Sequence, residues 1–220
     1  MELTIEQTLQ QGVAAHKEGK LQEAERFYRA ILQSQPAHPD ANHNLGVLAV
    51  SVNKADAALP LFKLALEANP KLEKFWLSYI DALIKEKQFE NAYKIARWLD
   101  NNSKVTRVIY PGLESHKQFD LATKQHSSPD GDPVYGSMIS FELDQSINLD
   151  SFAKQLSIIT LAESLGGVKS LISCPYSMTH ASVPDNEKMN LGITPNLLRF
   201  SVGIEHVDDL ISELDFAMNL

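Results

Sequence analysis

Apolar residues recur at helical spacing over the first hundred residues of the chain. The pattern predicts helices over residues 5–19, 21–34, 39–52 and 55–68, then one helix from about residue 72 and another from about residue 89. Pro36 and Pro70 follow the second and fourth of these helices, and a proline cannot continue a helix. The N-terminal part is therefore predicted to be all-α and built from helical pairs.

The same part of the chain repeats with a period of 34 residues. The matching positions are Gly12 and Gly46, Ala24, Ala58 and Ala92, Tyr28 and Phe62, and Pro36 and Pro70. This period, with small residues, an aromatic and a closing proline, is typical of the tetratricopeptide repeat, a pair of antiparallel helices. We predict about two and a half to three repeats over residues 1–90. They form either a groove for a partner protein or peptide, or a scaffold with no further role.

Beyond residue 100 the pattern changes to short segments rich in β-branched residues. They predict strands over residues 105–110 and 135–143 and near 158–160, 168–172 and 197–202, and helices over 115–125, 149–156 and 207–218. Residues 126–133 read as a turn-rich insertion and 174–191 mostly as loop. We expect an α+β small domain over residues 91–220, with a mainly antiparallel sheet and helices on one face. The helix near 89–100 serves both parts and makes a rigid junction.

Composition narrows the possible partners and the compartment. The 220 residues carry a net charge of −8, which argues against a nucleic-acid binder. One cysteine, Cys174, excludes an intrachain disulfide and favours a reducing compartment. No signal peptide or bilayer-spanning segment is visible, so we expect a cytoplasmic protein with no membrane partner. His16, His38 and His43 read as surface residues, and no metal site is predicted.

Two polar residues mark the candidate chemistry of the C-terminal part. Arg199 lies inside the apolar run 197–202, where a charge is costly unless an anion meets it. Ser164 stands shortly before the pair Gly166-Gly167. From the residues alone, Arg199 either joins an internal ion pair, with Ser164 in a turn, or binds a ligand carboxylate with its planar guanidinium.

The sequence around these residues resembles that of a known family. Residues 162–170, 177–184, 192–193 and 198–210 are similar to the C-terminal domain of the Cys/Met-metabolism enzymes that use pyridoxal phosphate (PLP), and within them to cystathionine γ-synthase and γ-lyase. The resemblance implies that Arg199 holds the substrate α-carboxylate, that Ser164 lies beside it, and that Glu163 helps to set substrate preference. PLP is the implied cofactor. Lys169 stands where the family motif commonly has Glu.

Other parts of the family pattern are absent from this sequence. No lysine stands in the Ser-x-Thr-Lys context on which the family builds its Schiff base, and the residues that hold the cofactor in the large domain have no counterpart over 1–90. We therefore assign no catalytic and no cofactor-binding residue, and expect that the chain alone does not bind PLP covalently. Arg199, Ser164 and Glu163 are the predicted substrate-binding residues.

Two functions follow from this combination. The first is a protein-interaction module fused to a catalytically incomplete fragment of a trans-sulfuration enzyme. The second is a part of an active cystathionine γ-synthase-like or γ-lyase-like enzyme that needs a separate large domain. A natural fusion, a truncated gene product and a chimera joined at Asn91-Ala92 would all show this pattern. Without a large domain, we expect an exposed apolar sheet face and self-association through it.

Overall fold

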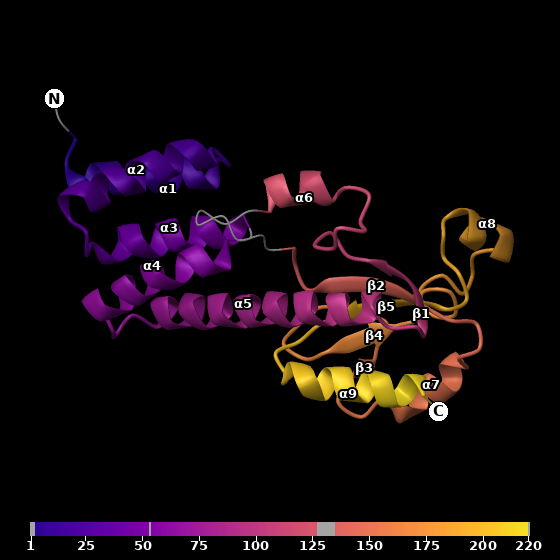
Figure 1. Ribbon diagram of the computed structural model, residues 1–220. Coiled ribbons are helices and arrows are strands. Elements are labelled where there is room, and N and C mark those ends of the chain that lie inside the picture. Colours follow the sequence, from indigo (N-terminus) through magenta and orange to yellow (C-terminus); the bar gives the residue numbers. More distant parts are fainter. Residues whose placement is uncertain (1–2, 53, 127–134, 220) are drawn as a thin grey trace. The chain divides into compact units, whose positions relative to one another are not determined.

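The computed structural model describes residues 3–52, 54–126 and 135–219 (Figure 1). The predicted turn-rich insertion lies outside these ranges except for His126. The chain folds into two compact units. The first unit takes the chain up to Glu86 and is helical, whereas the second takes Lys87–Gln125 and the chain from Tyr135 onward and contains a sheet.

The first unit holds two helical hairpins and the start of a long helix. Its helices are α1 (Ile5–Lys17), α2 (Leu21–Ser34), α3 (Pro39–Ser51), α4 (Ala55–Ala68) and the first half of α5 (Glu73–Asp100). Local chemistry sets their ends. Thr4 and Gln7 form a capping box at the start of α1. Gly19, at φ 75°, turns the chain into α2, because glycine reaches the left-handed region without a steric penalty.

The repeating glycines allow close packing within each hairpin. A Cβ on Gly12 would lie 2.6 Å from Cε1 of Tyr28, and a Cβ on Gly46 would lie 2.6 Å from Cε1 of Phe62. Both rings are buried, and the alanines that pack with them, Ala24 with Tyr28 and Ala58 with Phe62, are completely buried. The small and aromatic positions of the 34-residue period are therefore the inner faces of α1/α2 and α3/α4.

The third hairpin expected from the period does not form. Residues Glu73–Asp100 make one continuous helix, so the break expected before residue 89 is absent. The stretch contains no glycine or proline that could end a helix. Ile80 occupies the position of Gly12 and Gly46, and its side chain is 48% exposed. Ala92, which fits the period, instead belongs to the core of the second unit.

The prediction that His43 lies on the surface is wrong. Its side chain is buried between the rings of Phe62 and Phe75, with ring centroids 5.6 and 4.8 Å away. Its Nε2 lies 3.0 Å from Oγ of Ser78 on α5. His38 also has a structural role, because its Nδ1 accepts the N–H of Ala41 at the start of α3.

The second unit is a five-stranded sheet with helices. After α5 its elements are β1 (Val105–Ile109), α6 (Phe119–Gln125), β2 (Met138–Leu143), α7 (Leu149–Gln155), β3 (Thr160–Leu161), β4 (Leu171–Ser173), α8 (Asp185–Asn190), β5 (Leu197–Ser201) and α9 (Val207–Met218). The strand order is β1-β2-β5-β4-β3. The prediction of a mainly antiparallel sheet is wrong. The sheet is mixed, because β3 pairs with β4 in parallel.

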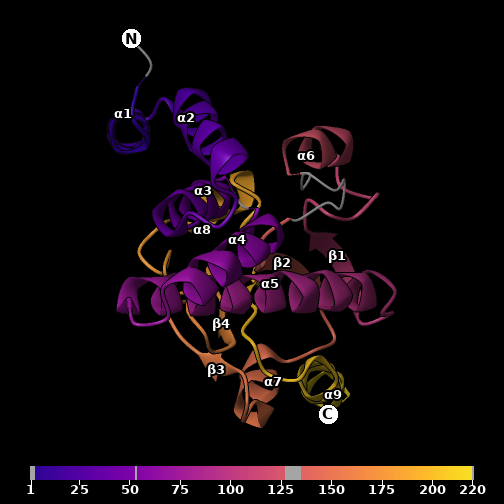
Figure 2. The ribbon, with the colours of Figure 1, turned by 90° about the vertical axis from the view of Figure 1, so that its left-hand side faces the viewer.

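One face of the sheet packs against helices. Ile139, Phe141, Leu198 and Phe200 of the central strands are almost completely buried together with Ile95 of α5. The same cluster takes in side chains of α7 and α9, which contact each other and lie along one side of the unit in both views (Figures 1 and 2). The helix α8, within the region predicted as loop, is a six-residue addition to the expected fold.

Candidate functional site

Arg199 lies at the centre of the middle strand, β5. Its neighbours Leu198 and Phe200 point into the helix-covered core, and because side chains alternate along a strand, Arg199 projects from the opposite face. The side chain is exposed, whereas the other four residues of β5 are buried. The apolar run around Arg199 suggested a buried charge. The alternation of side chains along the strand instead places its guanidinium in solvent.

Two serines flank Arg199 across the sheet. Ser140 of β2 and Ser173 of β4 are its direct cross-strand partners, so the three side chains form a row on one face. Ser201, two residues further along β5, is also buried, and no described residue bonds to its Oγ. This polar row interrupts the apolar patch expected on the face. Our sequence reading missed Ser140 and Ser173, although alternation within the predicted strands could have placed them opposite Arg199.

The other two predicted site residues follow the edge strand β3. The N–H of Ala162 donates to the carbonyl oxygen of Ile172 at 2.9 Å, which ties the start of the loop to β4. Glu163 and Ser164 come next and are exposed, and the chain then turns through Gly166 and Gly167 at φ 100° and 130°. Ser164 and Arg199 therefore belong to segments separated by β4 in the sheet.

The guanidinium of Arg199 has no acidic partner among the described residues on this face of the sheet. The carboxylate of Glu142 pairs instead with Nε of Arg107 at 3.2 Å and also accepts a hydrogen bond from the hydroxyl of Thr194. Among the described residues, no carboxylate lies within ion-pair distance of Arg199. The internal ion pair considered from the sequence is thus not formed. A free, planar guanidinium beside hydroxyl groups suits a carboxylate ligand.

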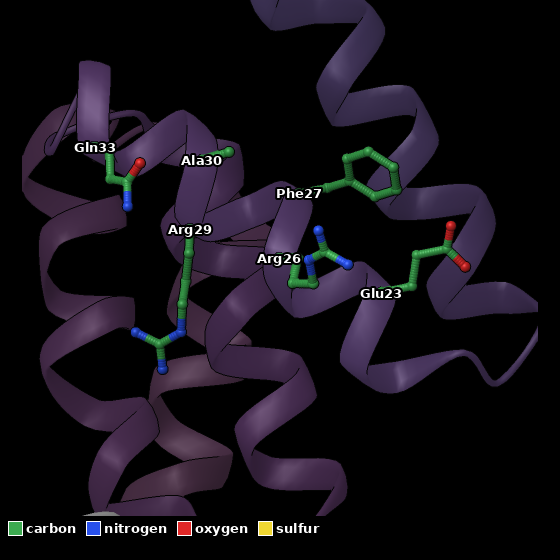
Figure 3. Close-up of a pocket in the computed structure, with 6 residues that line it drawn as sticks. All are labelled: Glu23, Arg26, Phe27, Arg29, Ala30 and Gln33. Atoms are coloured by element: carbon green, nitrogen blue, oxygen red, sulfur yellow. The ribbon is translucent and has the colours of Figure 1, made fainter.

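The first unit offers a surface hollow of about 610 Å³ along α2 (Figure 3). Its lining residues are Glu23, Arg26, Phe27, Arg29, Ala30 and Gln33. Nε of Arg29 donates to Glu25 at 2.8 Å, whereas no carboxylate of the described residues pairs with Arg26. An aromatic ring beside a free guanidinium is a surface that a peptide can contact.

Comparison with known proteins settles the family. The family model described as Cys/Met metabolism PLP-dependent enzyme matches residues 83–219, more than half of the chain. The chain belongs to the Cys/Met metabolism family of PLP-dependent enzymes. A tetratricopeptide repeat model also matches, over residues 39–72, which contain the α3/α4 hairpin. The family implies PLP as its cofactor.

Relatives of this Cys/Met metabolism enzyme domain include cystathionine lyases. The cystathionine beta-lyase of Lactococcus lactis is 44% identical over 137 residues, covering 62% of this chain and 34% of the relative. The cystathionine gamma-lyase of Mus musculus is 45% identical over 134 residues, covering 60% and 32%. The crystal structure of cystathionine gamma-lyase from Lactobacillus plantarum complexed with L-serine has a TM-score of 0.58 and 36% identity, covering 67% of this chain and 38% of that one. The chain thus spans about a third of the length of the curated relatives it matches.

The side chains of this Cys/Met metabolism enzyme domain do not fit PLP as a complete site. Among the described residues only one lysine, Lys188, is buried, and its ammonium lies 4.1 Å from the centre of the Tyr176 ring and 3.2 Å from Oδ1 of Asp185. These contacts hold its ammonium at the surface loop and not over a ligand site lined by Arg199. No group of three or more acidic, histidine or cysteine side chains gathers as a metal site within the described ranges. In the same ranges no helix has the length and apolar character needed to cross a membrane.

Proposed function

We propose that this chain is a protein-interaction module joined to the carboxylate-binding fragment of a trans-sulfuration enzyme. The single observation that carries the second half is Arg199, an exposed guanidinium in the central strand without an acidic partner among the described residues. Leaving a cation unpaired beside Ser140 and Ser173 contributes little to folding, whereas it provides the bidentate donor that a substrate α-carboxylate needs. Ser164 and Glu163 complete the proposed substrate side.

The fragment is catalytically incomplete in this proposal. PLP chemistry requires a lysine that joins the cofactor and groups that hold its ring and phosphate. Lys188 is held by Tyr176 and Asp185, and the sequence has no lysine in the Ser-x-Thr-Lys context. The expected activity of the chain alone is therefore carboxylate binding without turnover.

A second candidate is an active enzyme assembled from two chains. The family match begins at residue 83 and covers about a third of the relatives, so a separately supplied large domain could complete the site. In that case the chain would act on cystathionine or a related amino acid. The repeats would recruit a protein or peptide in either case, and self-association through the sheet face is a further proposal. The single cysteine supports a cytoplasmic location.

Carboxylate binding can be tested by NMR with L-serine as the probe. We expect a saturable shift of the Nε–H signal of Arg199 that L-serine methyl ester, which lacks the free carboxylate, does not produce. In the Arg199→Ala variant, the shifts that L-serine induces in the signals of other residues on this sheet face should disappear. Arg107→Ala is the matched control, because Arg107 lies on the same sheet and is already paired with Glu142. An L-serine response that survives Arg199→Ala would refute the proposed site.

A separate experiment tests whether the fragment is incomplete. The purified chain is titrated with PLP, reduced with borohydride and mapped by peptide mass spectrometry. We expect weak modification scattered over several exposed lysines. Saturable trapping at one lysine would contradict the proposal and favour the enzyme reading.

A further inference from the structure

Two buried amide side chains of α5 hold the loop that carries Glu163 and Ser164 and the segment that follows β5. Nε2 of Gln88 donates to the carbonyl oxygen of Gly167, the last residue of the glycine pair. Nδ2 of Asn91 donates to the carbonyl oxygens of Gly203 and Glu205, at 3.0 and 2.8 Å. These contacts join segments 79 to 114 residues apart in the sequence.

The two amides lie on one face of a well-anchored helix. Gln88 and Asn91 are three residues apart, so they are neighbours on the surface of α5. They are 8% and 0% exposed. Four and eight residues after Asn91 along α5, Ile95 and Leu99 are completely buried in the core of the same unit. Because packing fixes the helix, the two amide groups are presented from a rigid support, Gln88 to the loop and Asn91 to the segment after β5.

The segments that Asn91 and Gln88 hold are also joined to each other. The carboxylate of Glu205 accepts the N–H and the hydroxyl of Ser170, both at 2.8 Å. The hydroxyl oxygen of Ser170 in turn accepts the N–H of Gly203 at 2.9 Å. A Cβ on Gly203 would overlap with the backbone of Ser170 and with the Glu205 carboxylate, so this closure requires glycine. These hydrogen bonds among Ser170, Gly203 and Glu205 fix the chain immediately before β4 to the chain immediately after β5.

Within residues 163–167 little else holds the loop, although the carbonyl oxygen of Val168, directly after it, accepts the N–H of Ile204 at 3.0 Å. Gly166 and Gly167 have positive φ, and a glycine pair has large conformational freedom when it is not anchored. Glu163 and Ser164 are exposed, and no hydrogen bond from either side chain to a described residue holds the loop. The carbonyl oxygen of Gly167 is thus the point at which a donor from outside the loop can select one conformation.

We propose that Gln88 and Asn91 are positioning residues for the carboxylate site. They fix the glycine pair and the end of β5, and thereby set where Ser164 stands relative to the strand that carries Arg199. This inference rests on the proposed function, because the site it serves is the one assigned to Arg199. Neither amide is proposed to touch the ligand: Gln88 acts through the backbone of the loop, and Asn91 acts through the backbone that follows β5.

A series of substitutions at Gln88 separates positioning from bulk packing. Gln88→Glu keeps the shape but replaces the donor by an acceptor that faces the Gly167 carbonyl, Gln88→Ala removes the group, and Gln88→Lys restores a donor of similar reach. Gln118→Glu makes the same chemical change at an exposed position of the same unit and is the matched control. Asn91→Ala is a second variant, for the case that Gln88→Glu does not fold.

Two measurements are made on each variant. Amide hydrogen exchange of residues 163–167 reports on the loop, and the NMR titration with L-serine reports on the site. The loss of one hydrogen bond predicts about tenfold faster loop exchange in Gln88→Glu, a smaller rise in Gln88→Ala and values near wild type in Gln88→Lys. The dissociation constant for L-serine should rise in the same order, by at least about threefold in Gln88→Glu.

The outcomes distinguish this inference from the function on which it rests. Exchange that rises equally over the whole unit, or not at all in the loop, overturns the positioning role. Faster loop exchange with an unchanged L-serine affinity overturns it as well, since the loop would then not serve the site. If L-serine does not bind the wild-type chain, the proposed function fails, and this inference fails with it even if loop exchange follows the predicted order.

Discussion

Glu213 on α9 offers a sharp test of how the second unit is held together. Its side chain is 8% exposed, and its carboxylate accepts four hydrogen bonds. Oε1 accepts the N–H and the hydroxyl of Ser157 at 2.6 and 2.7 Å and the N–H of Ile158 at 2.7 Å. Oε2 accepts the N–H of Ile159 at 2.8 Å. These donors directly precede β3, the strand that leads to Glu163 and Ser164.

The substitution Glu213→Gln keeps the shape and removes the charge. The amide can retain one oxygen toward Ser157 and Ile158, but its NH₂ group then faces the buried N–H of Ile159. An unsatisfied buried N–H costs roughly 1–3 kcal/mol, and the three remaining bonds lose the extra strength that a charged acceptor provides. Allowing for non-additivity, we expect the free energy of unfolding to fall by about 2–4 kcal/mol at pH 7.

The difference between the two proteins should depend on pH. Burial opposes ionisation of Glu213, but the hydrogen bonds from residues 157–159 outweigh it and keep its pKa below the usual value. A carboxylate with a lowered folded pKa contributes stability above its unfolded pKa of about 4.3 and loses that contribution as pH falls through the folded pKa. The gap between wild type and Glu213→Gln should therefore be widest near neutral pH and narrow below pH 4.

Tryptophan fluorescence can follow the second unit alone. The chain has two tryptophans, Trp76 in the first unit and Trp98 in the second, so a Trp76→Phe background leaves Trp98 as the reporter. Urea unfolding is measured in this background for Glu213→Gln and for Asp215→Asn, an exposed carboxylate on the same helix. A loss below about 0.5 kcal/mol for Glu213→Gln, equal to that of the control, would refute the reasoning.

Three further outcomes follow from the structure. Gly46→Ala should destabilise the first unit by about 1–2 kcal/mol in thermal melts, because the new Cβ meets Phe62. Ile80→Ala at the equivalent repeat position is the control, and it should change the free energy of unfolding by less than about 0.5 kcal/mol. Burial lowers the pKa of His43, so the stability that the neutral imidazole contributes should be lost as pH falls below about 6.5. In urea titrations at pH 5–8, His43→Gln should make the free energy of unfolding depend less on pH. Burial raises the pKa of Cys174, so iodoacetamide should modify the native chain much more slowly than the urea-unfolded chain, and equal rates would contradict this.

Local patterns in the sequence were enough to place most elements. The 34-residue period located the α1/α2 and α3/α4 hairpins, since the residues that let two adjacent helices touch are close in sequence. The last helix was predicted with the bounds that α9 has, from its apolar face and its acidic first turn. The continuity of α5 was also readable, because no glycine or proline interrupts Glu73–Asp100, but the period was given more weight than this absence.

Tertiary structure decided which polar residues are buried and what they bind. His43 looked like a surface residue because its aromatic neighbours Phe62 and Phe75 are supplied by other helices. Arg199 looked buried because a run of apolar letters does not show which face of a strand each side chain takes. Asn91 meets its partners 112 and 114 residues away. The sequence by itself determined most of the helices and strands and the family, since these depend on neighbouring residues. The exposure of Arg199 and the anchoring of its neighbouring loop depend instead on which distant segments the fold brings together.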